Sequence, residues 1–327
     1  MTETRVPDLP APTGVPAPPV PVVALSGVTR AFGGVRALDE LDLVVPPNSI
    51  TVLLGPNGAG KTTAVRMITG ALDPHAGSVR VFGQDPSTDG EAVRRRCGVV
   101  SAKPALYDRL TGFDNLVYAA ELYGLGRHSE DRIRECAARF GIEDALGQMV
   151  GGYSTGMKTR LALSRSVLHD PDLLLFDEPT SGLDPESSHA VLDLIRQMQR
   201  DGSTVIMCTH LLLEAEGLAE QVVILEGGRN LISGSPGDLT LRYWPHVVVR
   251  LDAEHPHTLD VLADHPAVIR YRRGELAEIE IASVDVLPDI VAALVAGGVR
   301  VTRVDPHEPS LEDLYFAVRS DTRTVSP

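Results

Sequence analysis

Short apolar runs that end at glycine or polar positions recur along the chain and predict the buried strands of a parallel sheet. They cover residues 49–54, 173–176, 204–208 and 221–225. The first three runs are followed directly by glycine or by polar residues. Because open α/β sheets bind ligands beyond the carboxyl ends of their strands, we expect these three ends to contribute to one site.

The segments around these runs predict the rest of a first domain. Residues 22–25 and 41–45 have the composition of strands, and residues 62–69 have the spacing of a helix. Residues 86–168 are mostly helical in pattern, so we interpret them as a helical insert between strands of the sheet. Together these elements predict an α/β domain over residues 22–243.

A second, smaller domain is predicted after residue 243, where the pattern of strands and helices starts again. The order β-α-β-β-α-β indicates a small α+β domain of the split βαβ type over residues 244–320. Its expected elements are a strand at 246–251, a helix at 257–262, a hairpin at 268–272 and 275–281, a helix at 286–295 and a strand at 299–304. Residues 310–313 have the sequence of a capping box and predict a last helix.

The two ends of the chain are predicted to be tails. Residues 1–21 contain seven prolines, which favours an extended, unpacked segment. Residues 321–327 follow the last predicted helix and form a short second tail.

Composition narrows the class of protein. The 327 residues are 43% hydrophobic, which is enough for packed cores, and the net charge of -14 argues against a protein that binds nucleic-acid backbones. No apolar run approaches 18 residues, so we expect no transmembrane helix. The three cysteines fit neither a disulfide framework nor a zinc site, and we expect reduced thiols. The rarity of lysine beside arginine suggests a GC-rich, bacterial genome.

A glycine-rich loop joins the first buried run to the first helix, and its chemistry predicts phosphate binding. The glycines allow a tight turn whose N–H groups point at phosphate oxygens, and the helix dipole favours negative charge. Lys61 would reach the β- and γ-phosphates of a nucleotide, and the Thr62 hydroxyl would bind Mg²⁺. The predicted ATP-binding residues here are Gly55, Pro56, Asn57, Gly58, Ala59, Gly60, Lys61, Thr62 and Thr63.

Polar residues at the other strand ends supply candidates for catalysis. Asp177 suits Mg²⁺, and Glu178 is placed to polarise an attacking water. His210 follows the third run, where it could face the γ-phosphate, and a turn at 154–156 precedes a helix whose N-terminus could bind phosphate. Each of these features alone is more often structural. Behind a phosphate-binding loop, they favour a site that hydrolyses ATP.

The order of these motifs resembles the ATP-binding subunit of an ABC transporter. Residues 55–62 match the Walker A motif, 173–178 match Walker B, and 153–157 lie where the family signature sits. The resemblance implies a P-loop NTPase core with an antiparallel β edge and a helical insert. It also implies catalytic roles for Glu178 and His210. The further ATP-binding residues that it implies are Phe32, which would stack on adenine, Ser154 and Gly156 of the signature, and Asp184 of the D-loop.

The resemblance also implies partners and a location. Two such subunits would sandwich two ATP molecules with Mg²⁺, as a homodimer or paired with another nucleotide-binding subunit. The sequence at 309–315 is similar to the tail of drug-resistance-type exporter subunits, whose membrane permease is a separate chain. We therefore expect a subunit that powers export and lies peripherally on the cytoplasmic face of a bacterial membrane, with no nucleic acid as partner.

One position departs from the family pattern, and two other functions stay open. The glutamine that the family usually carries in its Q-loop falls on Ala102, which has no side-chain oxygen to offer to Mg²⁺ or water. A subunit that holds ATP but barely hydrolyses it is therefore one alternative. The other is an ABC-type ATPase that acts on the ribosome or on nucleic acid. The single nucleotide-binding domain and the acidic charge count against that reading.

Overall fold

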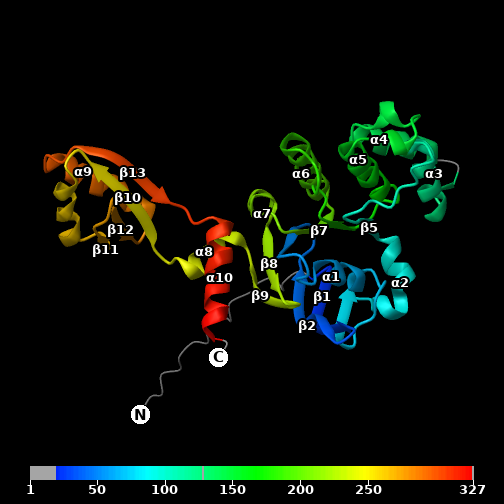
Figure 1. Ribbon diagram of the computed structural model, residues 1–327, viewed down its shortest axis with the longest axis horizontal. Coiled ribbons are helices and arrows are strands. Elements are labelled where there is room, and N and C mark those ends of the chain that lie inside the picture. Colours follow the sequence, from blue (N-terminus) through cyan, green and yellow to red (C-terminus); the bar gives the residue numbers. More distant parts are fainter. Residues whose placement is uncertain (1–19, 127–128, 326–327) are drawn as a thin grey trace, which may run out of the picture.

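The computed structural model describes residues 20–126 and 129–325, and in Figure 1 they form a large body joined to a smaller domain at the left of the view. The C-terminal helix stands between the two. In these described ranges, no helix has both the length and the apolar character needed to cross a membrane.

A six-stranded sheet forms the centre of the large body. Its order is β5-β6-β7-β3-β8-β9, and all neighbours are parallel except β8 and β9. Every residue of β3, β6 and β7 is buried, which explains why these strands are continuous apolar runs. The strands are β3 (Ile50–Leu54), β5 (Cys97–Val100), β6 (Leu173–Asp177), β7 (Thr204–Thr209), β8 (Gln221–Glu226) and β9 (Arg229–Gly234).

A three-stranded antiparallel sheet, in the order β2-β1-β4, packs against the first through α1 (Lys61–Ile68). The predicted antiparallel edge is therefore confirmed. Its strands are β1 (Val23–Phe32), β2 (Val35–Val45) and β4 (Ala76–Val81). β4 has only two buried residues, so its sequence carried little strand pattern.

The helical region differs from the predicted insert at its start. Within 86–168 the structure places β5, the edge strand of the central sheet, directly after α2 (Pro86–Arg95). With four residues, β5 is too short to show a pattern of its own. The helical unit proper comprises α3 (Gly112–Leu122), α4 (Ser129–Arg139) and α5 (Thr155–Ser166), which pack on one another.

The remaining helices of the large body flank the C-terminal strands of the central sheet. They are α6 (Pro185–Arg200), α7 (Leu212–Leu218) and α8 (Pro236–Tyr243). α6 and α8 both start with proline directly after a polar N-cap residue, Asp184 and Ser235 respectively.

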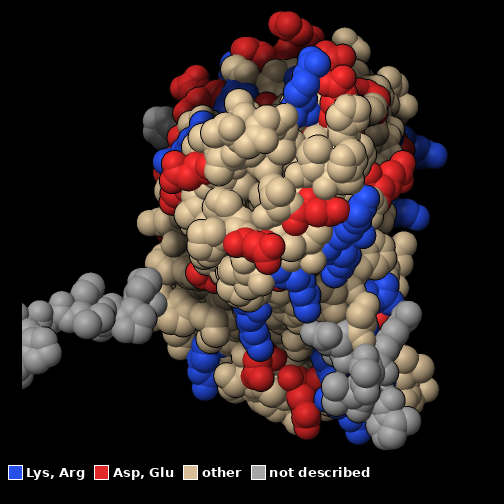
Figure 2. All heavy atoms as spheres, turned by 90° about the vertical axis from the view of Figure 1, so that its left-hand side faces the viewer, with Lys and Arg blue, Asp and Glu red and all other residues tan. Residues whose placement is uncertain are grey.

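The smaller domain has the predicted split βαβ order. Its antiparallel sheet runs β11-β12-β10-β13, and one face packs on a separate hydrophobic core with α9 and a 3₁₀ segment. Figure 2 looks onto this end of the molecule, where basic and acidic side chains alternate around uncharged surface. The elements are β10 (Val247–Ala253), the 3₁₀ segment Pro256–Asp264, β11 (Val268–Arg272), β12 (Ala277–Ile281), α9 (Leu287–Ala296) and β13 (Val301–His307).

The last helix, α10 (Leu311–Val325), departs from the predicted boundaries. Its residues Leu311, Leu314 and Val318 are buried in the core of the large body, not in that of the domain predicted over 244–320. The helix also continues to Val325, where we expected a tail from 321. The predicted tail 1–21 lies outside the described residues except for residues 20 and 21. The predicted cap is present, because the amide of Asp313 donates to the Ser310 hydroxyl at 3.1 Å.

Candidate functional site

The loop between β3 and α1 needs glycine at two positions for different reasons. Gly55 is crowded, because a Cβ atom there would lie 2.3 Å from the backbone oxygen of Leu225. Gly60, the N-cap of α1, has φ 107°, and its Cβ would lie 2.6 Å from the oxygen of Ala37. At these two positions the loop backbone therefore packs closely against β8 and β2, and a side chain would not fit.

A cleft of about 350 Å³ opens over this loop. Most of the predicted loop residues line it, together with both acidic residues at the end of β6. The lining consists of Ala37, Asn57, Gly58, Ala59, Gly60, Lys61, Thr62, Thr63, Ala102, Asp177 and Glu178. Gly55 and Pro56 lie beneath the cleft and do not line it, although Lys61 bonds to both.

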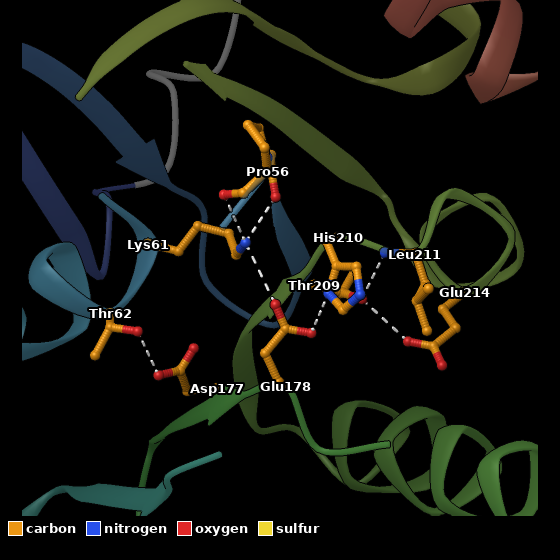
Figure 3. A network of polar contacts seen from close by, with 10 residues as sticks. Pro56, Lys61, Thr62, Asp177, Glu178, Thr209, His210, Leu211 and Glu214 are labelled. Atoms are coloured by element: carbon orange, nitrogen blue, oxygen red, sulfur yellow. Dashed lines mark hydrogen bonds and ion pairs between the residues drawn. The ribbon is translucent and has the colours of Figure 1, made fainter. Parts of the chain in front are cut away.

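Lys61 is 6% exposed and lies at the centre of the polar network in Figure 3. Its Nζ donates to the backbone oxygens of Gly55 at 2.6 Å and Pro56 at 3.3 Å. The same nitrogen lies 3.3 Å from Oε1 of Glu178. The ammonium group therefore has internal acceptors on two sides, and its charge is paired with a carboxylate at the neighbouring strand end.

A second pair lies at the start of α1. The Thr62 hydroxyl donates to Oδ2 of Asp177 at 2.7 Å. The two oxygens that were predicted as Mg²⁺ ligands therefore lie next to each other. Within the described ranges, no cluster of three or more His, Cys, Asp or Glu residues could hold a metal by itself. The Thr62–Asp177 pair itself fits Mg²⁺ bound to a nucleotide, which takes one or two protein oxygens and completes its shell with phosphate and water.

Glu178 joins Lys61 to His210. Its Oε2 lies 2.8 Å from Nδ1 of His210, because β6 and β7 are neighbours and both residues follow their strand ends. The Glu178 backbone has φ 54°, a left-handed conformation that is unusual outside glycine and costs about 1–3 kcal/mol. Its amide donates to the oxygen of Cys208 at 2.9 Å, which stabilises this turn.

The network continues into α7 through a residue pair that the sequence did not single out. The Thr209 hydroxyl donates to Oε2 of Glu214 at 3.1 Å and accepts from the amide of Leu211 at 3.0 Å (Figure 3). Thr209 is fully buried and Glu214 is 8% exposed. A buried glutamate is unusual, but its burial is visible only in the structure, so the sequence offered no signal for this pair.

Comparison with known proteins decides the family. Residues 38–181 match the family model described as ABC transporter. The daunorubicin/doxorubicin resistance ATP-binding protein DrrA of Streptomyces peucetius is 40% identical over 225 residues, 68% of this chain and 67% of that protein. The chain belongs to the ABC transporter ATP-binding proteins. As a member, it binds and hydrolyses ATP.

Other relatives extend this ABC ATPase assignment along the chain. The daunorubicin resistance ATP-binding protein DrrA3 of Streptomyces coeruleorubidus is 33% identical over 93% of this chain and 97% of that protein. A solved structure described as the ATP binding subunit of an ABC transporter has a TM-score of 0.62 and 29% identity, covering 68% of this chain and 93% of that one. The predicted resemblance to drug-resistance-type subunits is confirmed.

Besides Gly55, Pro56 and His210, four predicted site residues of this ABC ATPase do not line the cleft. Ser154 caps α5 by accepting from the amide of Met157 at 3.2 Å, and Asp184 caps α6 by accepting from Ser187. The hydrogen bond from the Ser187 hydroxyl is the main cause that lowers the pKa of Asp184. A Cβ on Gly156 would lie 3.7 Å from the Ser187 hydroxyl oxygen, so the two helix starts adjoin. They form one surface, apart from the cleft lining.

Phe32, the fourth, ends β1 and is 44% exposed, with the Arg30 guanidinium 5.0 Å from its ring centre. Ala102 does line the cleft, where it presents only a methyl group. The hydroxyl of the neighbouring Ser101 donates to the backbone oxygen of Lys103 at 2.8 Å, away from the cleft lining.

The three cysteines of the ABC ATPase are free and buried, as the reduced thiols predicted from the sequence would be. Burial raises the pKa of Cys97 to about 12 and holds that of Cys208 well above its ordinary value. Neither thiol is a nucleophile at neutral pH, so they play no part in the proposed chemistry.

Proposed function

We propose that this ABC ATPase powers export of a substrate through a separate membrane permease. The relatives that support export by name are the daunorubicin-resistance proteins and the Nod factor export ATP-binding protein I of Rhizobium etli, which is 34% identical over 73% of this chain. The single observation that best supports ATP hydrolysis by this chain is the contact of Glu178 with both Lys61 and His210 beside the phosphate-binding loop.

In the proposed mechanism, the loop amides and Lys61 bind the β- and γ-phosphates of ATP. Thr62 and Asp177 would hold Mg²⁺, which neutralises charge on the phosphate oxygens. Glu178 orients the attacking water with the carboxylate that now contacts Lys61 and His210. His210 holds this carboxylate in place and contacts the γ-phosphate.

The second half of the site is proposed to come from a paired subunit. Ser154, Gly156 and Asp184 form a continuous surface that does not line the cleft of their own chain. In a pair of nucleotide-binding subunits, this surface covers the partner's ATP, and Phe32 stacks on the adenine of its own chain's ATP. An isolated protomer therefore binds ATP but hydrolyses it slowly.

A groove beside the nucleotide cleft is the proposed docking site of the permease. Two hollows of about 250 and 330 Å³ share Val99 and Tyr123 and run between α1, β5 and α3. One end reaches Thr62 and Asp177, and the other is lined by exposed aromatic rings such as Tyr118. An apolar permease segment fits this groove, which would hold the subunit on the cytoplasmic face of the membrane.

The decisive test is Glu178→Gln, which keeps the shape of the side chain and removes its charge. We expect steady-state ATP turnover to fall about 10²–10⁴-fold while binding of a fluorescent ATP analogue is retained. Equal turnover in both proteins would refute the catalytic assignment.

Ala102 favours the second candidate, a subunit that holds ATP but turns it over slowly. That candidate predicts tight binding with negligible wild-type turnover even in complex with the co-purified permease.

A further inference from the structure

The C-terminal domain is attached to the large body by short connections next to the C-terminal helix. β13 ends at His307 and α10 begins at Leu311, so residues 308–310 alone join them. α10 then packs on both α7 and α8, and Figure 1 shows it between the two parts of the molecule. The C-terminal domain is therefore joined to α10 by a short link of three residues.

α7, on which α10 packs, begins two residues after the histidine of the site. Leu211 is its N-cap, and His210 is the preceding residue. Thr209, on the other side of His210, is bonded to both Leu211 and Glu214 through its hydroxyl (Figure 3). His210 thus lies between two residues that are tied to α7, Leu211 as its N-cap and Thr209 through Glu214.

Glu216 connects α7 to α10. Its Oε1 accepts from the amide of Leu311 at 3.2 Å, the first amide of α10. The first amides of a helix lack intrahelical partners and carry positive partial charge, so a carboxylate is well suited to hold that end. Glu214 and Glu216 are two residues apart on a helix and therefore face opposite sides. Glu214 bonds to Thr209, and Glu216 bonds to the start of α10.

We infer that α10 positions His210 through α7, and that the C-terminal domain adjusts ATP turnover by this route. The inference rests on the proposed role of His210 beside Glu178. Glu214 and Glu216 are positioning residues in it, since neither lines the nucleotide cleft. The competing explanation is that α10 only completes the hydrophobic core.

A matched pair of variants separates the two explanations. Glu216→Ala removes the acceptor for the first amide of α10. Glu226→Ala removes a carboxylate at the end of β8. Arg319, in the second half of α10, donates to that carboxylate at 2.8 and 2.9 Å. We expect Glu216→Ala to lower kcat about three- to tenfold without weakening ATP binding. Glu226→Ala should leave kcat unchanged, and Glu216→Gln, which keeps an acceptor oxygen, should restore most of it.

A double-mutant cycle tests the route through His210. If Glu216 acts through the histidine, Glu216→Ala should have no further effect on kcat in a His210→Ala background. Additive losses would overturn the inference, as would equal losses in Glu216→Ala and Glu226→Ala or no loss in either.

Amide hydrogen exchange supplies a readout that does not depend on turnover. We expect exchange over residues 209–218 to rise in Glu216→Ala and to match the wild type in Glu226→Ala. Identical exchange in all three proteins would overturn the inference. A wild-type chain without ATP turnover would instead refute the proposed function, and the exchange pattern would still decide the link from α10 to α7.

Discussion

Charged side chains are arranged differently in the nucleotide cleft and on the outer face of the C-terminal sheet. In the cleft, Lys61 is 6% exposed and Glu178 14%, and they come from different elements. On the C-terminal sheet, Arg250 and Arg272 lie directly opposite Glu278 on adjacent strands, each 3.3 Å from it, and are 42% and 66% exposed. Partly desolvated charges that converge on a backbone loop indicate chemistry, whereas exposed cross-strand pairs contribute mainly to solubility and register.

Replacing Lys61 tests this contrast most severely. Lys61→Met should lower ATP turnover about 10²–10³-fold, because the phosphates lose a buried ammonium group and Glu178 loses one of its two partners. Steady-state phosphate release measures the effect. Arg95→Met, which removes the exposed partner of Glu91 on α2, is the control and should leave turnover unchanged. Similar losses in both variants would mean that cation removal acts through net charge.

The second-largest effect is expected when glycines of the phosphate-binding loop are replaced. Gly60→Ala combines a left-handed φ with a clash against the oxygen of Ala37, so we expect a loss of roughly 2–4 kcal/mol in the free energy of unfolding. Gly58→Ala also has positive φ, at 84°, but nothing lies within 4 Å of its Cβ, and it should cost only about 1 kcal/mol. Denaturant titration compares the two. Equal costs would show that the loop relaxes around the added methyl group.

The smallest effect is expected on the C-terminal sheet. Glu278→Gln removes the carboxylate shared by Arg250 and Arg272, yet the free energy of unfolding should change by less than about 1 kcal/mol. ATP turnover should not change. A larger loss, seen by thermal or denaturant unfolding, would place these pairs among the interactions that stabilise the domain and would weaken the contrast with the cleft.

The sequence predicted those parts of the fold that depend on local pattern. β3, β6 and β7 were found because every position is buried and most are apolar, and the loop at 55–62 because its glycines and Lys61 follow the first of these runs directly, in the spacing of a phosphate-binding motif. β4 was missed because four of its six residues are exposed, which leaves no period to detect.

The sequence could not predict which residues meet across the fold. Glu178 and His210 were expected near one site, but their direct contact depends on the parallel pairing of β6 with β7. Thr209 and Glu214 gave no motif, since a hydroxyl and a carboxylate five residues apart become partners only when α7 packs back on the strand. The assignment of α10 to the wrong core has the same origin, because the sequence of a helix shows that it has an apolar face but not which core that face packs against.

The placement of α10 has a consequence for synthesis of the chain. Leu314 and Val318 complete the core of the large body, yet the ribosome makes them after the entire C-terminal sheet. Residues 247–307 form their own core and can fold as a unit while that helix is still inside the exit tunnel. The large body, in contrast, keeps an uncovered apolar strip beside α7 until α10 has left the tunnel, and termination before α10 would release a chain with that strip exposed.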